Sequence, residues 1–103
     1  KSKNPIAFKG EVDRVYVKTG ADCVITDPGL GRKIRIAKTG SASTVVWTPW
    51  KDKADKMGDM GGVANAGWRN MVCVESANAM DNVVTVAPGA THTLAVKYTV
   101  ESL

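Results

Sequence analysis

The sequence contains no run of about 18 apolar residues, the length that a membrane-spanning helix requires. Its first ten residues, KSKNPIAFKG, also lack the apolar core of a signal peptide. These two absences predict a soluble chain with no membrane partner. A chain of 103 residues is one domain's worth and buries only about 60–70% of its unfolded surface. Its stability is therefore expected to be modest unless another chain covers an open face.

Histidine and cysteine are scarce. The chain has one histidine, His92, and two cysteines, Cys23 and Cys73, which have apolar neighbours and no CxxC spacing. Transition-metal sites are built from clusters of such residues, so no metal site is predicted. Free thiols in a reducing cytoplasm are the default for cysteines of this kind. His92 follows a Pro-Gly turn at the start of the last predicted strand, and we expect a surface position for it.

The common motifs of nucleophilic catalysis and phosphate binding are also missing. There is no GxSxG, and neither cysteine has a histidine nearby in the sequence. The stretch GLGRK has neither the Walker spacing nor a following helix. Carboxylates are therefore the remaining candidates for chemistry.

The net charge of +4 comes from basic residues that are scattered along the chain. The densest group, Arg32 to Lys38, alternates with Ile34 and Ile36, a pattern typical of a strand with one solvated face. No basic cluster is interleaved with exposed aromatic residues, so nucleic acid is not a predicted partner. A positive net charge does favour a small anion such as a sugar phosphate.

Short alternating segments separated by turns predict an all-β fold. The one segment without strand character, 51–60, predicts a short helix or single turn, followed by a loop to residue 67. We expect one domain over 1–103, an antiparallel β-sandwich or half of a larger one. The predicted strands are 8–17, 23–26, 32–38, 44–48, 68–76, 82–86 and 91–101.

Glu75 ends an otherwise apolar strand face. Side chains alternate along a strand, which places Met71 and Cys73 on the face of Glu75 and the neighbouring valines on the other. A carboxylate in such surroundings needs a partner or water. Glu75 is therefore either a capped structural group or a base held in a pocket.

Asp13 is the second candidate, because it shares a strand face with Val15 and Val17. A structural role, as partner of a neighbouring basic strand, remains open for it. Two acids that face one cleft could bind sugar hydroxyls and abstract a proton. Asp13 and Glu75 are the residues on which this interpretation depends.

The order and spacing of several motifs resemble the C-terminal part of the hexose-6-phosphate 1-epimerases, also called glucose-6-phosphate mutarotases. The resemblance extends from about Phe8 to Val100. The segments that carry it are FKGEVDRVY, ITDPGLGRKIRI, TVVWTPWKDKADKMGDMG, WRNMVCVESAN and VTVAPGATHTL.

This resemblance implies a galactose-mutarotase-like supersandwich and acid/base interconversion of sugar anomers without a cofactor. It implies that Glu75 is the general base that takes the proton from the C1 hydroxyl, and that Asp13 binds a sugar hydroxyl. The family enzymes are more than twice as long as this chain. The histidine that acts as their general acid, and the basic residues that bind the phosphate, lie mostly in the N-terminal part. His92 matches none of the family's histidines.

Two hypotheses stay open. In the first, the chain is the C-terminal segment of such an epimerase, inactive or weak alone. In the second, it is a free-standing, non-catalytic β module that self-associates and retains some sugar binding. Half a supersandwich leaves open strand edges and an uncovered apolar face, so we expect a homodimer or a larger assembly.

Overall fold

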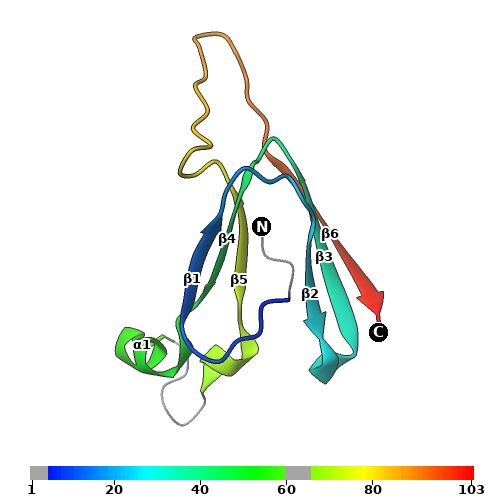
Figure 1. The fold of residues 1–103 in the computed structure, drawn as a ribbon, viewed down its shortest axis with the longest axis vertical. Helices are drawn as coiled ribbons and strands as arrows, with labels where there is room; N and C mark the ends of the chain where they lie inside the picture. Colours follow the sequence, from blue (N-terminus) through cyan, green and yellow to red (C-terminus); the bar gives the residue numbers. More distant parts are fainter. Residues whose placement is uncertain (1–4, 60–65) are drawn as a thin grey trace. The chain divides into compact units, whose positions relative to one another are not determined.

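The computed structural model describes residues 5–59 and 66–103, and within them the chain is mostly β (Figure 1). The strands form two three-stranded antiparallel sheets, in the orders β1-β4-β5 and β2-β3-β6. This confirms the predicted all-β class and is consistent with a β-sandwich. The strands are β1 (Val12–Tyr16), β2 (Cys23–Asp27), β3 (Arg32–Thr39), β4 (Ser43–Thr48), β5 (Cys73–Ala77) and β6 (Ala95–Ser102).

The β2-β3-β6 sheet has the one-sided pattern that its central strand predicts. Ile34 and Ile36 share a face of β3, and Ile36 is only 4% exposed. In the antiparallel register Ile36 lies between Cys23 of β2 and Tyr98 of β6. The turn that joins β2 to β3 is the 3-10 helix η1 (Pro28–Leu30), where proline presets the first φ.

The predicted helix is present as α1 (Trp50–Met57). It begins directly after Pro49. β4 ends at Thr48, the last residue of the predicted strand 44–48, because proline cannot donate to a sheet ladder. The helix ends at Gly58, whose left-handed φ of 74° lets its N–H bond the carbonyl of Ala54. The remainder of the predicted loop lies partly in residues 60–65, outside the described residues.

The predicted strands 8–17 and 91–101 begin later than expected, at Val12 and Ala95, and two other predicted strands differ more strongly from the structure. Residues 82–86 are not a strand, because no other strand pairs with them in the described chain, and Val83 and Val86 are exposed. Apolar alternation alone does not make a strand without a hydrogen-bonding neighbour. The first part of the predicted 68–76 strand is instead the 3-10 helix η2 (Gly67–Asn70), in which Trp68 is buried.

The described chain folds as two compact units, with boundaries inside β4 and β5. Unit 1 comprises residues 1–16 and 45–75, and unit 2 comprises residues 17–44 and 76–103. The predicted single domain over 1–103 stays a prediction. Among the residues that the structure describes, the buried apolar side chains of the core are few: Val46, Ala54 and Trp68 in unit 1, and Ile36 in unit 2. None of the described helices has the length and apolar character needed to cross a membrane.

Candidate functional site

Glu75 lies at the centre of β5 and is the exposed residue of that strand. Its neighbours Cys73, Val74, Ser76 and Ala77 are all half-buried. The sequence left open a capped group or a base in a pocket, and the structure shows a carboxylate that solvent reaches. An exposed carboxylate remains available as a hydrogen-bond acceptor.

The negative charge of Glu75 affects the pKa of the Cys73 thiol. The two residues are two apart on one strand, so their side chains leave the same face. Burial raises the pKa of Cys73 above its ordinary value of 9.0, and the negative charge of Glu75 raises it further. Cys73 is therefore a protonated, poorly nucleophilic thiol at neutral pH.

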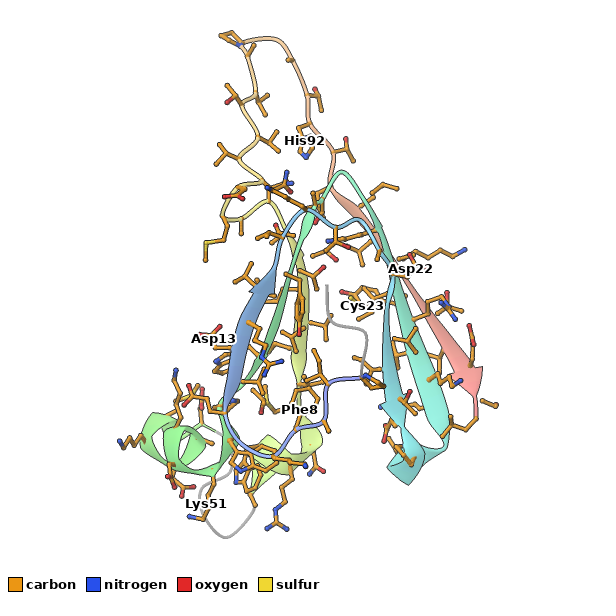
Figure 2. The ribbon with its side chains drawn as sticks, in the orientation of Figure 1. Phe8, Asp13, Asp22, Cys23, Lys51 and His92 are labelled. Carbon is orange, nitrogen blue, oxygen red and sulfur yellow. The ribbon has the colours of Figure 1, made fainter. Side chains whose placement is uncertain are left out.

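Asp13 lies on β1 and is also exposed (Figure 2). Its strand neighbour Val12 is half-buried, as are Val15 and Tyr16 further along the strand. The predicted alternation is therefore only partly kept, because both Val15 and Tyr16 are half-buried although they point to opposite faces. The sequence placed both Asp13 and Glu75 on strands, and only the structure showed that the two side chains are exposed.

The structure places both candidate acids in unit 1 and in one sheet. Asp13 is on β1 and Glu75 is on β5, the two outer strands that flank β4. Neighbouring strands lie about 4.8 Å apart, which separates the two outer strands by about 10 Å. Neither carboxylate forms a side-chain hydrogen bond or an ion pair with another described residue. By contrast Glu11, just before β1, is 3.4 Å from the ammonium of Lys53.

Aromatic packing fixes the segment that leads into β5. The rings of Trp50 and Trp68 have centroids 4.7 Å apart at an angle of 50°, and Trp68 is 8% exposed. Arg69 lies over the ring of Trp68, with its guanidinium carbon 5.1 Å from the ring centroid. The contact between the two rings attaches η2 to the start of α1, and the burial of Trp68 is explained by this structural role.

The phenolic oxygen of Tyr16, in the same unit, is buried and has no hydrogen-bond partner among the described residues. A buried hydroxyl without a partner is costly to the fold. The sequence contains no signal for this feature, because a tyrosine in a strand usually reaches water or a carbonyl with its hydroxyl.

A polar network that sequence reasoning missed lies in unit 2. The Lys38 ammonium donates to the carbonyl of Ser43 at 2.8 Å and to the hydroxyl of Thr44 at 2.7 Å. The hydroxyls of Ser41 and Ser43 both donate to the carbonyl of Ala77, at 2.6 and 2.7 Å. Burial lowers the pKa of Lys38 below its ordinary value of 10.5. The available signal was the run of small, mostly polar residues from Thr39 to Thr44, which begins between the predicted strands 32–38 and 44–48.

His92 is exposed, as predicted, and belongs to the same unit (Figure 2). Its Nε2 is 3.0 Å from the carbonyl oxygen of Gly40 and 3.2 Å from the side-chain oxygen of Asn78. Both partners are oxygen acceptors, so the N–H at Nε2 is the donor in these contacts. This contact attaches the segment before β6 to the β3–β4 turn. His92 therefore has a structural role.

The described residues hold two further findings that bear on ligands. No three of their His, Cys, Asp or Glu side chains come together as a metal site. A shallow pocket in unit 2 is lined by Lys18, Ala42, Asp81 and Asn82. The side-chain oxygen of Asn82 in this pocket already accepts hydrogen bonds from the backbone of Ala42 and from Asn78, at 2.7 and 2.8 Å.

Comparison with known proteins identifies relatives for almost the entire chain. The family model of aldose 1-epimerase matches residues 1–99. A protein of Cenchrus ciliaris named as a glucose-6-phosphate 1-epimerase is 38% identical over 84 residues, which is 82% of this chain. Proteins of the same name from Escherichia coli and Salmonella typhimurium are 34% and 35% identical over 72% and 70% of the chain.

The chain spans about a quarter of these relatives, since each alignment covers 24% of the relative's length. No solved structure matches it. The match nonetheless extends over nearly every residue of the chain, and it includes the strands that carry Asp13 and Glu75. The resemblance expected from the sequence motifs is therefore confirmed, and the chain belongs to the aldose 1-epimerase family.

Proposed function

We propose that this chain carries the general base and one sugar ligand of a cofactor-independent hexose-6-phosphate 1-epimerase. Glu75 accepts the proton of the sugar's C1 hydroxyl while the bond between C1 and the ring oxygen breaks. A general acid protonates the ring oxygen, which leaves an open-chain aldehyde. Rotation about the C1–C2 bond and ring closure on the other face return both protons. No electrons are gained or lost, so the reaction needs no redox cofactor.

The observation that supports this proposal is that the two carboxylates are exposed and have no partner among the described residues. Glu75 and Asp13 are exposed and form no hydrogen bond or ion pair with other described residues, so both can accept hydrogen bonds from a ligand. Their strands are about 10 Å apart, a span that a hexose phosphate with hydroxyls along its ring can bridge. The family relationship supplies the expected substrate class, a sugar.

The general acid is the part that this chain does not offer. Its single histidine, His92, lies in unit 2 and donates to the Gly40 carbonyl. A positioned acid or base usually contributes about 10²- to 10⁴-fold to a rate. We therefore propose that the chain alone is a weak or inactive catalyst and that full activity requires the acid and the phosphate-binding residues of a longer protein.

Exchange NMR of glucose-6-phosphate anomers tests the role of the base. The chain is compared with Glu75→Gln and Asp13→Asn, and with Glu11→Gln as a matched control in which another exposed carboxylate of unit 1 is neutralised. We expect a small acceleration by the unmodified chain and the control, a complete loss with Glu75→Gln, and weaker sugar binding with Asp13→Asn. Equal acceleration by Glu75→Gln would refute the assignment of the base.

A second candidate function is a non-catalytic β module that self-associates and binds sugars. The observation that favours it is the exposure of two large apolar side chains on β6, Tyr98 at 64% and Val100 at 63%. The same NMR samples separate the two functions. Sugar binding with no acceleration by the unmodified chain supports the module.

A further inference from the structure

β6 is an edge strand whose apolar side chains are exposed. It is the last strand of the β2-β3-β6 sheet, and no described strand pairs with its other side (Figure 1). In the register with β3, Tyr98 lies opposite Ile36 and Val100 lies opposite Ile34. Tyr98 and Val100 therefore continue the apolar face of this sheet to its edge. Exposed apolar edges are sites at which another strand can pair.

The backbone of β6 presents its free hydrogen-bonding groups at even-numbered positions. The N–H of Leu103 donates to the carbonyl of Gly31 at 3.0 Å, which turns the odd-numbered residues toward β3. Successive residues of an antiparallel strand point their N–H and C=O groups in opposite directions. Val96, Tyr98, Val100 and Ser102 consequently direct these groups to the open edge.

The other face of β6 carries two charges of opposite sign. Lys97 and Glu101 leave the same face, four residues apart, with Thr99 midway between them. No ion pair in the described part of the chain includes Lys97, whereas Glu101 is 3.4 Å from Arg35 on β3. Arg35 in turn lies 3.9 Å from Asp22, so the charges across this face alternate in sign from Asp22 to Glu101.

We propose that β6 pairs antiparallel with β6 of a second copy of this chain, around a twofold axis at Thr99. In this register Lys97 lies opposite Glu101 of the second copy, and the twofold axis repeats the pair. Tyr98 lies opposite Val100 of the second copy, on the apolar face. The result is a continuous six-stranded sheet, three strands from each copy, with aromatic–β-branched and opposite-charge pairs across the new contact.

Charge selects this register over its neighbours. Only even-numbered residues can form the new backbone bonds, so the axis can move only by whole residues along β6. An axis at Lys97 or at Glu101 places like charges opposite each other, which destabilises a pair. An axis at Tyr98 or at Val100 leaves both charges opposite neutral residues. Thr99 is the position at which both charges are paired, and this self-complementarity indicates a second copy as the partner.

Charge reversal tests the proposal by sedimentation velocity over a range of protein concentrations. We expect the unmodified chain to dimerise, and Lys97→Glu and Glu101→Lys each to weaken the dimer about tenfold or more, since each variant sets like charges opposite. An equimolar mixture of the two variants pairs opposite charges again and should form heterodimers. Lys56→Glu, on α1, makes the same charge change away from β6 and should leave the dimer intact.

Three results would overturn the proposal: a monomer at about 100 µM, well above the micromolar Kd typical of modest interfaces; a dimer that ignores both reversals; or a mixture that stays monomeric. Circular dichroism checks that each variant is folded. Glucose-6-phosphate turnover does not enter this experiment, so the dimer stands or falls independently of the epimerase function.

A disulfide at the twofold axis gives a second measurement. In a chain with Cys23→Ser and Cys73→Ser, the variant Thr99→Cys places two thiols opposite each other in a non-hydrogen-bonded pair, about 4.5 Å apart between Cα atoms. We expect a covalent dimer on mild oxidation. Ala95→Cys is the control, because its copies would lie about 26 Å apart, eight residues along the strand. Faster crosslinking of the control than of Thr99→Cys would exclude this register.

Discussion

The Glu75 carboxylate and the Cys73 thiol leave the same face of β5, and the charge of Glu75 adds to burial in raising the pKa of Cys73. The thiol thus serves as a natural reporter for the proposed base. Neutralising Glu75 changes the local charge without removing side-chain volume, so the reporter can be read in a folded chain.

Glu75→Gln is expected to lower the pKa of the Cys73 thiol, because the neutral amide no longer opposes formation of the thiolate. Burial is the larger cause, so the pKa should stay above 9.0 in the variant. The pH dependence of Cys73 alkylation, followed by mass spectrometry of the labelled peptide, measures the change. Glu11→Gln serves as the control, and an unchanged alkylation profile in Glu75→Gln would show that the two side chains do not interact.

Lys38→Met is expected to reduce the free energy of unfolding by about 1–3 kcal/mol. The substitution removes the donor to the Ser43 carbonyl and the Thr44 hydroxyl in the part-buried network. Lys33→Met, at an exposed position of the same strand, should change stability by no more than about 0.5 kcal/mol. Urea unfolding at pH 7 compares the three proteins. Equal midpoints for both variants would contradict the structural role of Lys38.

The stability difference between the unmodified chain and Lys38→Met is expected to grow as the pH rises toward 10.5. The pKa of Lys38 is lowered in the folded chain, so the unfolded chain binds more protons between the folded value and 10.5. Stability therefore rises with pH in that window. The raised pKa of Cys73 makes the stability fall with pH above 9.0. This effect is the same in both proteins, so it cancels in the stability difference between them. A difference that shrinks with pH, measured by urea titrations at several pH values, would reverse the predicted sign.

Gly40→Ala is expected to destabilise the chain more than Gly31→Ala. Both glycines have a left-handed φ, 73° and 63°. A Cβ at Gly40 would collide with the carbonyl oxygen of Thr93, whereas nothing lies within 4 Å of a Cβ at Gly31. The control should lose about 1–2 kcal/mol from its backbone conformation alone, and Gly40→Ala should lose more. Thermal or urea unfolding measures both, and equal losses would show that the segment containing Thr93 moves freely away.

Tyr16→Phe is expected to leave stability unchanged or to increase it by about 1 kcal/mol. The hydroxyl is buried without a hydrogen-bond partner among the described residues, so its removal deletes an unfavourable burial while keeping the ring. Tyr98→Phe, at an exposed ring, is the comparison. If urea unfolding finds that Tyr16→Phe is clearly destabilising, the hydroxyl has a favourable partner in solution.

The local pattern of the sequence determined most of the strands. The alternation of Ile34 and Ile36 with basic residues predicted β3 because side chains in a strand flip at every residue. Pro49 predicted the end of β4 because it lacks an amide proton. The motifs around Asp13 and Glu75 also identified the family, since they are read directly from the order of residues.

Only the tertiary structure decided what surrounds those residues. Residues 82–86 alternate like a strand but have no pairing neighbour in the described chain, and a strand exists only through its hydrogen-bonded partners. Trp68 entered a 3-10 helix because its ring packs against Trp50, a contact between residues far apart in sequence. The exposure of Glu75 and the network around Lys38 likewise depend on which segments meet in space, and periodicity along one strand carries no information about that.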